Sequence, residues 1–286
     1  MQKHVWFIIL VFFTFYSVFG ALNYLEFGTP NNSNDFYFHF FKAKGEYSPM
    51  LETHYSLQDF QKYPSLFHVL FTPFTANTFV FYLALMVLIC VLIPIIIYGI
   101  NSKWFSVLLY FTVVSLPHMV IYNATYAQAL VIVWLLAYIL LRKKSKLFYL
   151  LFLVLAWLTH REGIILFAIV GFIELLAMFK QKFALMVILQ GVNTRAFPNL
   201  VEIFVLHLNP VVWWLLLKSK KNFFYNALIV VGFVVTWFDS RTIFISQIGI
   251  ILSITQKPNK WVWLGLLIYL IIYLYSFLGA TISLLY

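Results

Sequence analysis

Asp35 and His39 stand four positions apart in the aromatic segment N-D-F-Y-F-H-F-F-K. On a helix this spacing places both side chains on one face. A carboxylate held at the edge of a membrane is partly desolvated, which suits it to act as a general base. The alternative is a solvated loop helix with an incidental acid. We take both residues as candidate catalytic residues.

The same segment predicts how its helix begins and where it lies. Asn34 is a residue type that caps helix N-termini. The apolar neighbours Phe36, Phe40 and Phe41 would rest the helix on the membrane interface.

A second polar group closes the same loop, in the segment Y-P-S-L-F-H from Tyr63 to His68. Pro64 fits the first turn of a helix that continues into the next apolar segment. His68 would then face the space that the loop encloses, and it is the third candidate catalytic residue. A lone histidine in such a place is more often a packing or hydrogen-bonding residue.

The turn T-H-R-E-G at 159–163 places His160, Arg161 and Glu162 between two apolar segments. Charged side chains at a membrane edge are by default candidates for function. Asp239 and Arg241 form a second tight turn, and Arg195 lies in a third polar connection. The planar guanidinium of arginine suits phosphate or pyrophosphate. The alternative pairs Arg161 with Glu162 and Arg241 with Asp239.

The elements that must position these residues are apolar helices. The chain is 63% hydrophobic and 10% charged, with a mean hydropathy of +0.92, which excludes a soluble globular domain. A single cysteine excludes a disulfide framework and a thiol metal site. Repeated apolar runs predict an all-α polytopic membrane protein with about nine to eleven transmembrane or re-entrant helices. We place them near 5–22, 78–98, 104–121, 125–141, 147–159, 163–179, 183–192, 209–217, 222–238, 241–256 and 261–283.

The charges predict the orientation of these helices. With the N-terminus in the cytoplasm, most of the 19 basic residues fall in inner loops, as the positive-inside rule requires. Every acid except Glu174, which lies within a span, then falls outside. This distribution speaks against nucleic acid as a partner. We expect one transmembrane domain over 1–286, with residues 23–77 forming a large first extracytoplasmic loop that carries short interfacial helices and the active site.

The motifs together resemble the GT-C superfamily of integral-membrane glycosyltransferases. The features that carry the resemblance are the D-x-Y-x-H pattern at 35–39, Y-P-x-x-x-H at 63–68, the turns at 159–163 and 239–241, and N-P-x-x-W-W at 209–214. They are similar to those of the members that use polyprenyl-phosphate sugars. The chain is short for the superfamily, and the second carboxylate motif is not evident. No metal site is predicted, although a divalent cation stays open.

The resemblance implies roles for the candidate residues. Asp35 would take the proton from an acceptor hydroxyl, which attacks the anomeric carbon of a lipid-phosphate sugar with inversion. Arg161 and Arg241 would stabilise the charge on the departing phosphate. His39, His68 and His160 would orient the phosphate or the acceptor. The implied partners are the lipid bilayer, a polyprenyl- or dolichyl-phosphate donor, and a glycan, lipid or protein acceptor. Arg195 joins the phosphate-binding set, and Glu162, Asp239 and Tyr63 complete the candidate site.

Three alternatives stay open. A polymerase or ligase of lipid-pyrophosphate-linked polysaccharide repeats would also use outer arginines and histidines, and the segment from Tyr126 to Ala129 is compatible with one. A transporter would need buried ionisable residues, for which Glu174 is the one candidate. A non-catalytic subunit of a membrane complex is the third.

Overall fold

A computed structural model describes residues 3–31, 33–48, 51–52, 54–112, 117, 121, 126–145, 147–179, 223–236, 243–253 and 264. Every regular element in these residues is a helix, which confirms the predicted all-α class. The chain divides into two compact units. The first comprises residues 1–107 and 117–175, and the second comprises 108–116 and 176–286. The single domain over 1–286 stays a prediction.

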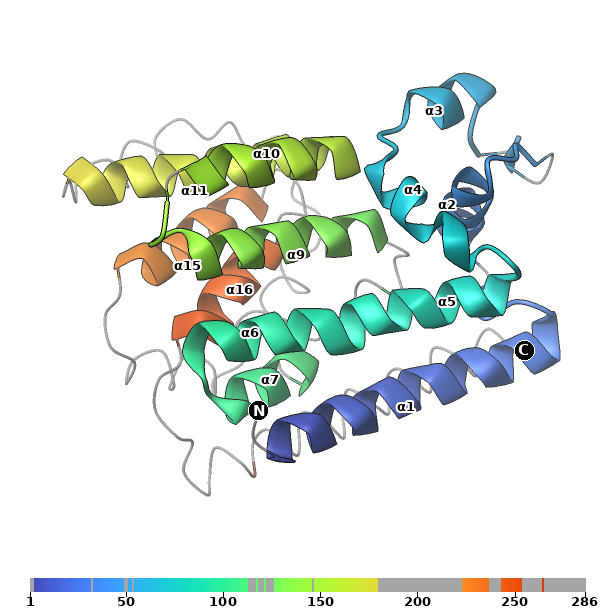
Figure 1. The fold of residues 1–286 in the computed structure, drawn as a ribbon, viewed down its shortest axis with the longest axis horizontal. Coiled ribbons are helices and arrows are strands. Elements are labelled where there is room, and N and C mark those ends of the chain that lie inside the picture. Colours follow the sequence, from blue (N-terminus) through green and yellow to red (C-terminus); the bar gives the residue numbers. More distant parts are fainter. Residues whose placement is uncertain are drawn as a thin grey trace. The chain divides into compact units, whose positions relative to one another are not determined.

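The first unit is built on long helices that lie side by side (Figure 1). They are α1 (Lys3–Phe27), a continuous helix made of α5 (Thr78–Val87), η3 (Leu88–Leu92) and α6 (Ile93–Asn101), then α9 (Tyr126–Leu141) and α10 (Leu147–Thr159). The contacts run in order from α1 to α5, from α6 to α9 and from α9 to α10. The Tyr82 hydroxyl donates to the Tyr16 carbonyl at 3.0 Å, and its ring fills the space beside Gly20.

The helix over 78–101 changes its winding in the middle. At η3 the chain makes a π-helical turn, in which the Ile93 N–H donates to the Leu88 carbonyl. Pro94, which has no N–H, follows directly. The half before this turn packs against α1, and the half after it packs against α9.

Three short helices gather at one end of these long helices (Figure 1). They are α2 (Asn34–Lys44), α3 (Leu57–Lys62) and α4 (Leu66–Phe71), which continues into a 3-10 turn over Thr72–Phe74. Phe36 and Phe40 of α2 are buried and contact Phe81 of α5, with ring centroids 5.7 and 5.5 Å apart. The prediction that these rings face the membrane interface is therefore wrong, because they pack inside the protein.

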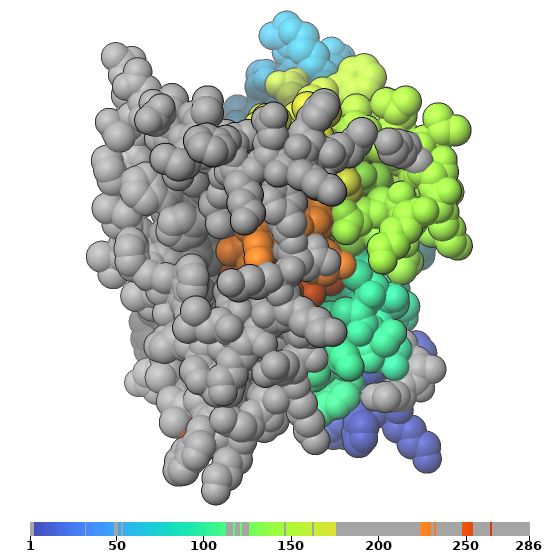
Figure 2. All heavy atoms as spheres, turned by 90° about the vertical axis from the view of Figure 1, so that its left-hand side faces the viewer, coloured from blue at the N-terminus to red at the C-terminus, as the bar shows by residue number. Residues whose placement is uncertain are grey.

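The opposite end of the long helices carries basic turns. The N-terminus of α1, the α6–α7 turn and the α9–α10 turn all lie at the end remote from α2–α4 (Figure 1). Lys3, Lys103, Lys143 and Lys144 are exposed there. Figure 2 looks onto this end, where atoms of the α6–α7 and α9–α10 regions, teal and light green, form part of the surface.

The remaining described helices complete the two units. Helix α11 (Glu162–Phe179) follows α10 after a tight turn, and its residues up to Leu175 belong to the first unit. Boundaries between the units therefore fall within α7 (Trp104–Thr112) and within α11. In the second unit, α15 (Phe223–Thr236) packs against α16 (Ile243–Ser253), with Gly249 set closely against Ile229.

The long apolar helices in the described residues overlap predicted spans, but not all of them are long enough to span a membrane. Within the described residues, Lys3–Phe27 and Thr78–Asn101 have the length and apolar composition of a membrane span. Tyr126–Leu141, Leu147–Thr159 and Gly163–Leu175 are shorter apolar helices. The predicted spans at 183–192, 209–217 and, apart from Leu264, 261–283 lie outside the described residues, as does the N-P-x-x-W-W motif at 209–214.

Candidate functional site

Helix α2 holds Asp35 and His39 because both of its ends are capped. At its start the Phe36 N–H donates to the Ser33 hydroxyl at 3.1 Å, so Ser33 is the N-cap and the predicted cap, Asn34, is the first helical residue. Gly45 ends the helix in the left-handed conformation, with φ +78°. Asp35 is half-buried in the first turn, where the helix dipole favours a negative charge.

The start of α2 is tied to α9 by Asn31, which the sequence analysis missed. Its side-chain N–H group donates to the Ile121 carbonyl at 2.9 Å and to the Tyr126 hydroxyl at 2.7 Å. Its side-chain oxygen accepts from the Ser33 N–H at 2.9 Å. Asp35 lies within electrostatic range of Tyr126. Asn31 reads as a linker residue in the segment T-P-N-N-S-N, so no local pattern indicates a contact with a helix 95 residues away.

His39 and His68 form a buried pair at the centre of the site. Nδ1 of His39 lies 3.0 Å from Nε2 of His68, and the rings stack with centroids 5.2 Å apart. The two side chains are 5% and 2% exposed. Nδ1 of His68 contacts the Pro64 carbonyl at 3.1 Å. Pro64 precedes the cap of α4 and lies outside its first turn, which corrects the prediction.

Both histidines are neutral near pH 7. Burial lowers the pKa of His39 well below its usual value, and the neighbouring His68 and His160 lower it further. Burial, followed by the ammonium of Lys42, lowers the pKa of His68 to about 3, although the Pro64 carbonyl acts in the opposite direction. The pair is therefore a source of hydrogen-bonding nitrogens without positive charge.

An aromatic cluster holds α2, α3 and the loop between them together. Phe38, Leu51 and Phe60 are its buried members, and the half-buried rings of Tyr37, Phe41, Tyr47, Tyr55 and Tyr63 pack against them. Lys42 lies at its edge, where Nζ donates to the Phe60 carbonyl and stands 4.8 Å from the centre of the Phe60 ring. This cluster fixes α3 and the segment that leads to His68.

The α10–α11 turn brings His160 to the same place. His160 is buried, and its ring centroid lies 5.6 Å from that of Tyr63. Just before it, the Thr159 hydroxyl accepts from the Trp134 ring N–H at 3.0 Å. Gly163 allows the two helices to approach, because a Cβ there would stand 2.4 Å from the Ala156 carbonyl oxygen. The predicted turn therefore holds His160 against the first loop.

Arg161 follows His160 and is exposed on the same turn. Its charge reaches Asp59 of α3: the hydrogen bond from Ser56 lowers the pKa of Asp59, and Arg161 acts more weakly in the same direction. Asp59 is thus the acid whose titration Arg161 influences. Glu162 begins α11. Arg195, Asp239 and Arg241 lie outside the described residues.

The described contacts thus bring most of the predicted site residues together at one end of the first unit. His39 touches His68 and Tyr63, Tyr63 touches His160, and Arg161 is the next residue. Asp35 lies one turn before His39 on the same helix. Among the described residues, no group of three or more His, Cys, Asp or Glu side chains could hold a metal ion.

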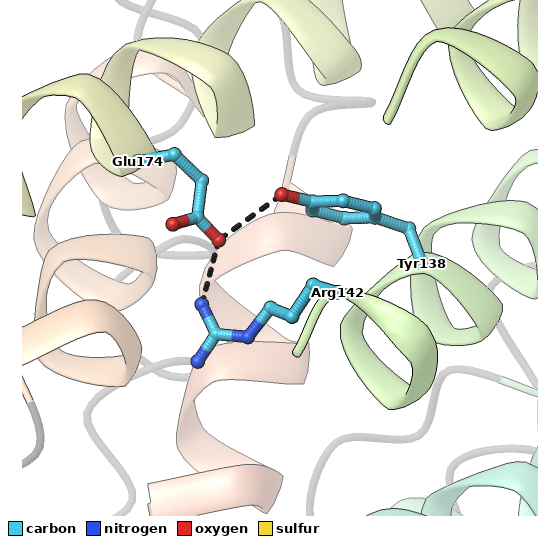
Figure 3. A network of polar contacts seen from close by, with 3 residues as sticks. All are labelled: Tyr138, Arg142 and Glu174. Carbon is cyan, nitrogen blue, oxygen red and sulfur yellow. Dashed lines mark hydrogen bonds and ion pairs between the residues drawn. The ribbon is translucent and has the colours of Figure 1, made fainter. Parts of the chain in front are cut away.

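Glu174 takes part in a different network (Figure 3). One of its carboxylate oxygens, Oε1, accepts from the Arg142 guanidinium at 2.7 Å and from the Tyr138 hydroxyl at 3.1 Å. Arg142 follows the C-terminal end of α9, whereas Tyr126 of the candidate site begins that helix. Glu174 therefore has a basic partner at the far end of α9, which the sequence did not indicate.

Comparison with protein-family models finds no match, and comparisons with curated proteins and with solved structures find none either.

Proposed function

We propose that this chain is a polytopic membrane glycosyltransferase. It moves a sugar from a polyprenyl or dolichyl phosphate to an acceptor hydroxyl on the extracytoplasmic face, with inversion at the anomeric carbon. The observation that carries the proposal is the gathering of Asp35, the His39–His68 pair and the Arg161 turn at one end of a group of apolar helices.

The membrane setting rests on the helix surfaces and the charges. Large apolar side chains are exposed along α1 and α10, among them Trp6, Phe7, Leu150, Val154 and Trp157. Such a surface suits lipid rather than water. The basic turns lie at the end opposite α2–α4, so the positive-inside rule puts the N-terminus in the cytoplasm and the site outside.

The chemistry needs a base, a phosphate site and the space between them. Asp35 removes the proton from the acceptor hydroxyl, whose oxygen forms a bond to the anomeric carbon. The bond from that carbon to the phosphate oxygen breaks, and the lipid phosphate leaves with its electron pair. Arg161 stabilises the charge on the phosphate. A share of Arg241 and Arg195 in this role stays a prediction from the sequence. The lipid tail lies along the apolar helix surfaces.

The test is to incubate the purified protein in nanodiscs with short-chain polyprenyl phosphates that each carry one sugar. Release of the lipid phosphate together with a glycosylated acceptor of opposite anomeric configuration is the expected result. If no sugar-bearing lipid monophosphate in a broad panel turns over, with or without a divalent cation, the proposal is wrong.

The polymerase alternative has one observation in its favour. Tyr126 and His160 are residues that a polymerase of this kind would use, and they lie near each other. The His39 ring lies 6.4 Å from that of Tyr126, and Tyr63 links His39 to His160. The same assay separates the two. A polymerase would consume an oligosaccharide on a lipid pyrophosphate and leave the monophosphate donors untouched.

A further inference from the structure

The contacts of His68 fix which of its ring nitrogens carries the proton. A backbone carbonyl can only accept a hydrogen bond, so Nδ1 of His68, 3.1 Å from the Pro64 oxygen, must donate. A neutral imidazole has one N–H group. Nε2 of His68 therefore carries a lone pair.

The same reasoning then shows which ring nitrogen of His39 carries the proton. Its Nδ1 lies 3.0 Å from the lone pair on His68, so Nδ1 of His39 must be the donor. Nε2 of His39 consequently carries a lone pair and faces away from the pair. No described side chain forms a hydrogen bond with that nitrogen. The chain of hydrogen bonds from Pro64 through His68 thus ends at Nε2 of His39, a nitrogen that can accept a hydrogen bond.

The position of His39 indicates which group can donate a hydrogen bond to this nitrogen. His39 lies one helical turn, about 6 Å along the axis, after Asp35. The His39 ring also contacts Tyr63, and Tyr63 contacts His160, with ring centroids 5.7 and 5.6 Å apart in succession. Arg161 is the residue after His160. In an in-line displacement the transferred sugar lies between the base and the departing phosphate. The contacts of His39 thus link it to both residues that we assign to these roles, Asp35 on its own helix and Arg161 next to His160.

We propose that Nε2 of His39 accepts a hydrogen bond from a hydroxyl of the transferred sugar, with His68 as the positioning residue that holds His39 in this tautomer. This assignment rests on the proposed function and narrows it. A phosphate offers lone pairs and negative charge, which an unprotonated nitrogen repels. A sugar hydroxyl offers the proton that this nitrogen needs. The low pKa of His39 also makes it a weak base, which leaves proton removal to Asp35.

The tautomer can be measured on the intact protein, without substrate. Nitrogen NMR of the full chain, labelled with ¹⁵N-histidine and reconstituted in nanodiscs, reports the proton on each ring nitrogen. At pH 7 we expect both His39 and His68 to carry the proton on Nδ1, with signals assigned by comparison with His39→Phe and His68→Gln. A proton on Nε2 of His39, or a charged His39 ring, overturns the proposal.

Two probes then test what His39 binds: a short-chain polyprenyl phosphate with one hexose, chosen from the panel as a substrate, and the same lipid phosphate without sugar. The sugar-bearing probe should shift the Nε2 signal of His39, and the bare lipid phosphate should not. Equal shifts with both probes, or none with either, overturn the proposal. If the wild type turns over the donor while His39 does not respond, only this inference falls and the transferase proposal stands.

Variants give a second readout. His39→Phe keeps an aromatic ring but has no nitrogen, so the preference for the sugar-bearing probe should fall about 3- to 10-fold, as for one lost hydrogen bond. The affinity for the bare lipid phosphate should not change, which also shows that the variant is folded. His68→Gln retains an acceptor for Nδ1 of His39 and should keep most of the preference, whereas His68→Phe should lose it. Equal affinities of wild type and His39→Phe for the sugar-bearing probe contradict the proposal.

Discussion

Arg142 and Glu174 stand 32 residues apart in the chain and form an ion pair of 2.7 Å, with side chains 15% and 29% exposed. The Tyr138 hydroxyl donates to the same carboxylate oxygen (Figure 3). The pair joins the end of α9 to α11. It also supplies the partner that an acid in an apolar helix requires.

Replacing one partner of this pair should destabilise the protein more than replacing both partners together. We expect Arg142→Met and Glu174→Leu each to cost about 1–3 kcal/mol, because each leaves a poorly solvated charge without its partner. The double variant should cost clearly less than the sum. Thermal unfolding in detergent, followed by tryptophan fluorescence, measures all three variants.

The Lys44–Glu46 pair is the matched control. Its side chains are 40% and 55% exposed, so the same cycle there should give a coupling of about 0–1 kcal/mol. Additive effects at Arg142 and Glu174 would show that their interaction contributes nothing to stability.

Asp35→Asn should abolish the proton acceptor and preserve the shape of the site. We expect turnover of the lipid-phosphate donor to fall about 10²- to 10⁴-fold, with donor affinity nearly unchanged. The measurement is release of lipid phosphate alongside a binding titration. Glu46→Gln, an exposed acid beyond the end of α2, should retain full turnover. Equal turnover of Asp35→Asn and wild type would place the base elsewhere.

Gly163→Ala should disturb the turn that holds His160. The added methyl group would stand 2.4 Å from a backbone oxygen, so we expect a loss of about 1–3 kcal/mol and reduced turnover. Gly99→Ala, in α6, is the control. Its nearest neighbour would stand at 3.9 Å, and alanine favours a helix over glycine. Similar unfolding midpoints for the two variants would show that the turn tolerates a side chain.

Stability should fall as the pH falls below about 6.5. The unfolded chain protonates its histidines near that pH, whereas native His68 has a pKa of about 3. Between these values the unfolded state binds more protons, so each pH unit removes up to about 1.4 kcal/mol for His68, and His39 acts in the same direction.

The His68→Gln variant isolates this effect. Lys42 and His160, the other groups whose charges act on His68, are present in both proteins. The unfolding midpoint measured between pH 7 and pH 5 should therefore drop less in His68→Gln than in the wild type. Parallel curves for the two proteins would contradict a buried neutral His68.

The sequence predicts the helices because their signals are local. Apolar runs, and the polar residues that separate them, locate α1, the helix over 78–101, α9, α10, α11, α15 and α16. The candidate site residues are also selected by type and spacing. The structure brings residues 39, 63, 68 and 160 together, with Asp35 one turn before His39 on α2.

What the sequence does not predict depends on partners far along the chain. The sequence alone predicts that Phe36 and Phe40 face the membrane interface, whereas in the structure both rings pack against Phe81. The link from Asn31 to Tyr126 joins two segments that show no common pattern. The side-chain period of a helix tells which residues share a face, but it does not tell which neighbour that face meets.

The π-helical turn before Pro94 holds one residue more than an α-helical turn, because its hydrogen bond spans five residues instead of four. Deleting Cys90 would therefore restore ordinary α-helical winding and leave the side chains after it in nearly their present directions against α9. A deletion within α5 would instead swing the side chains after it by about 100°. The wide turn is thus the place where this helix can lose a residue and still present the same surface to α9.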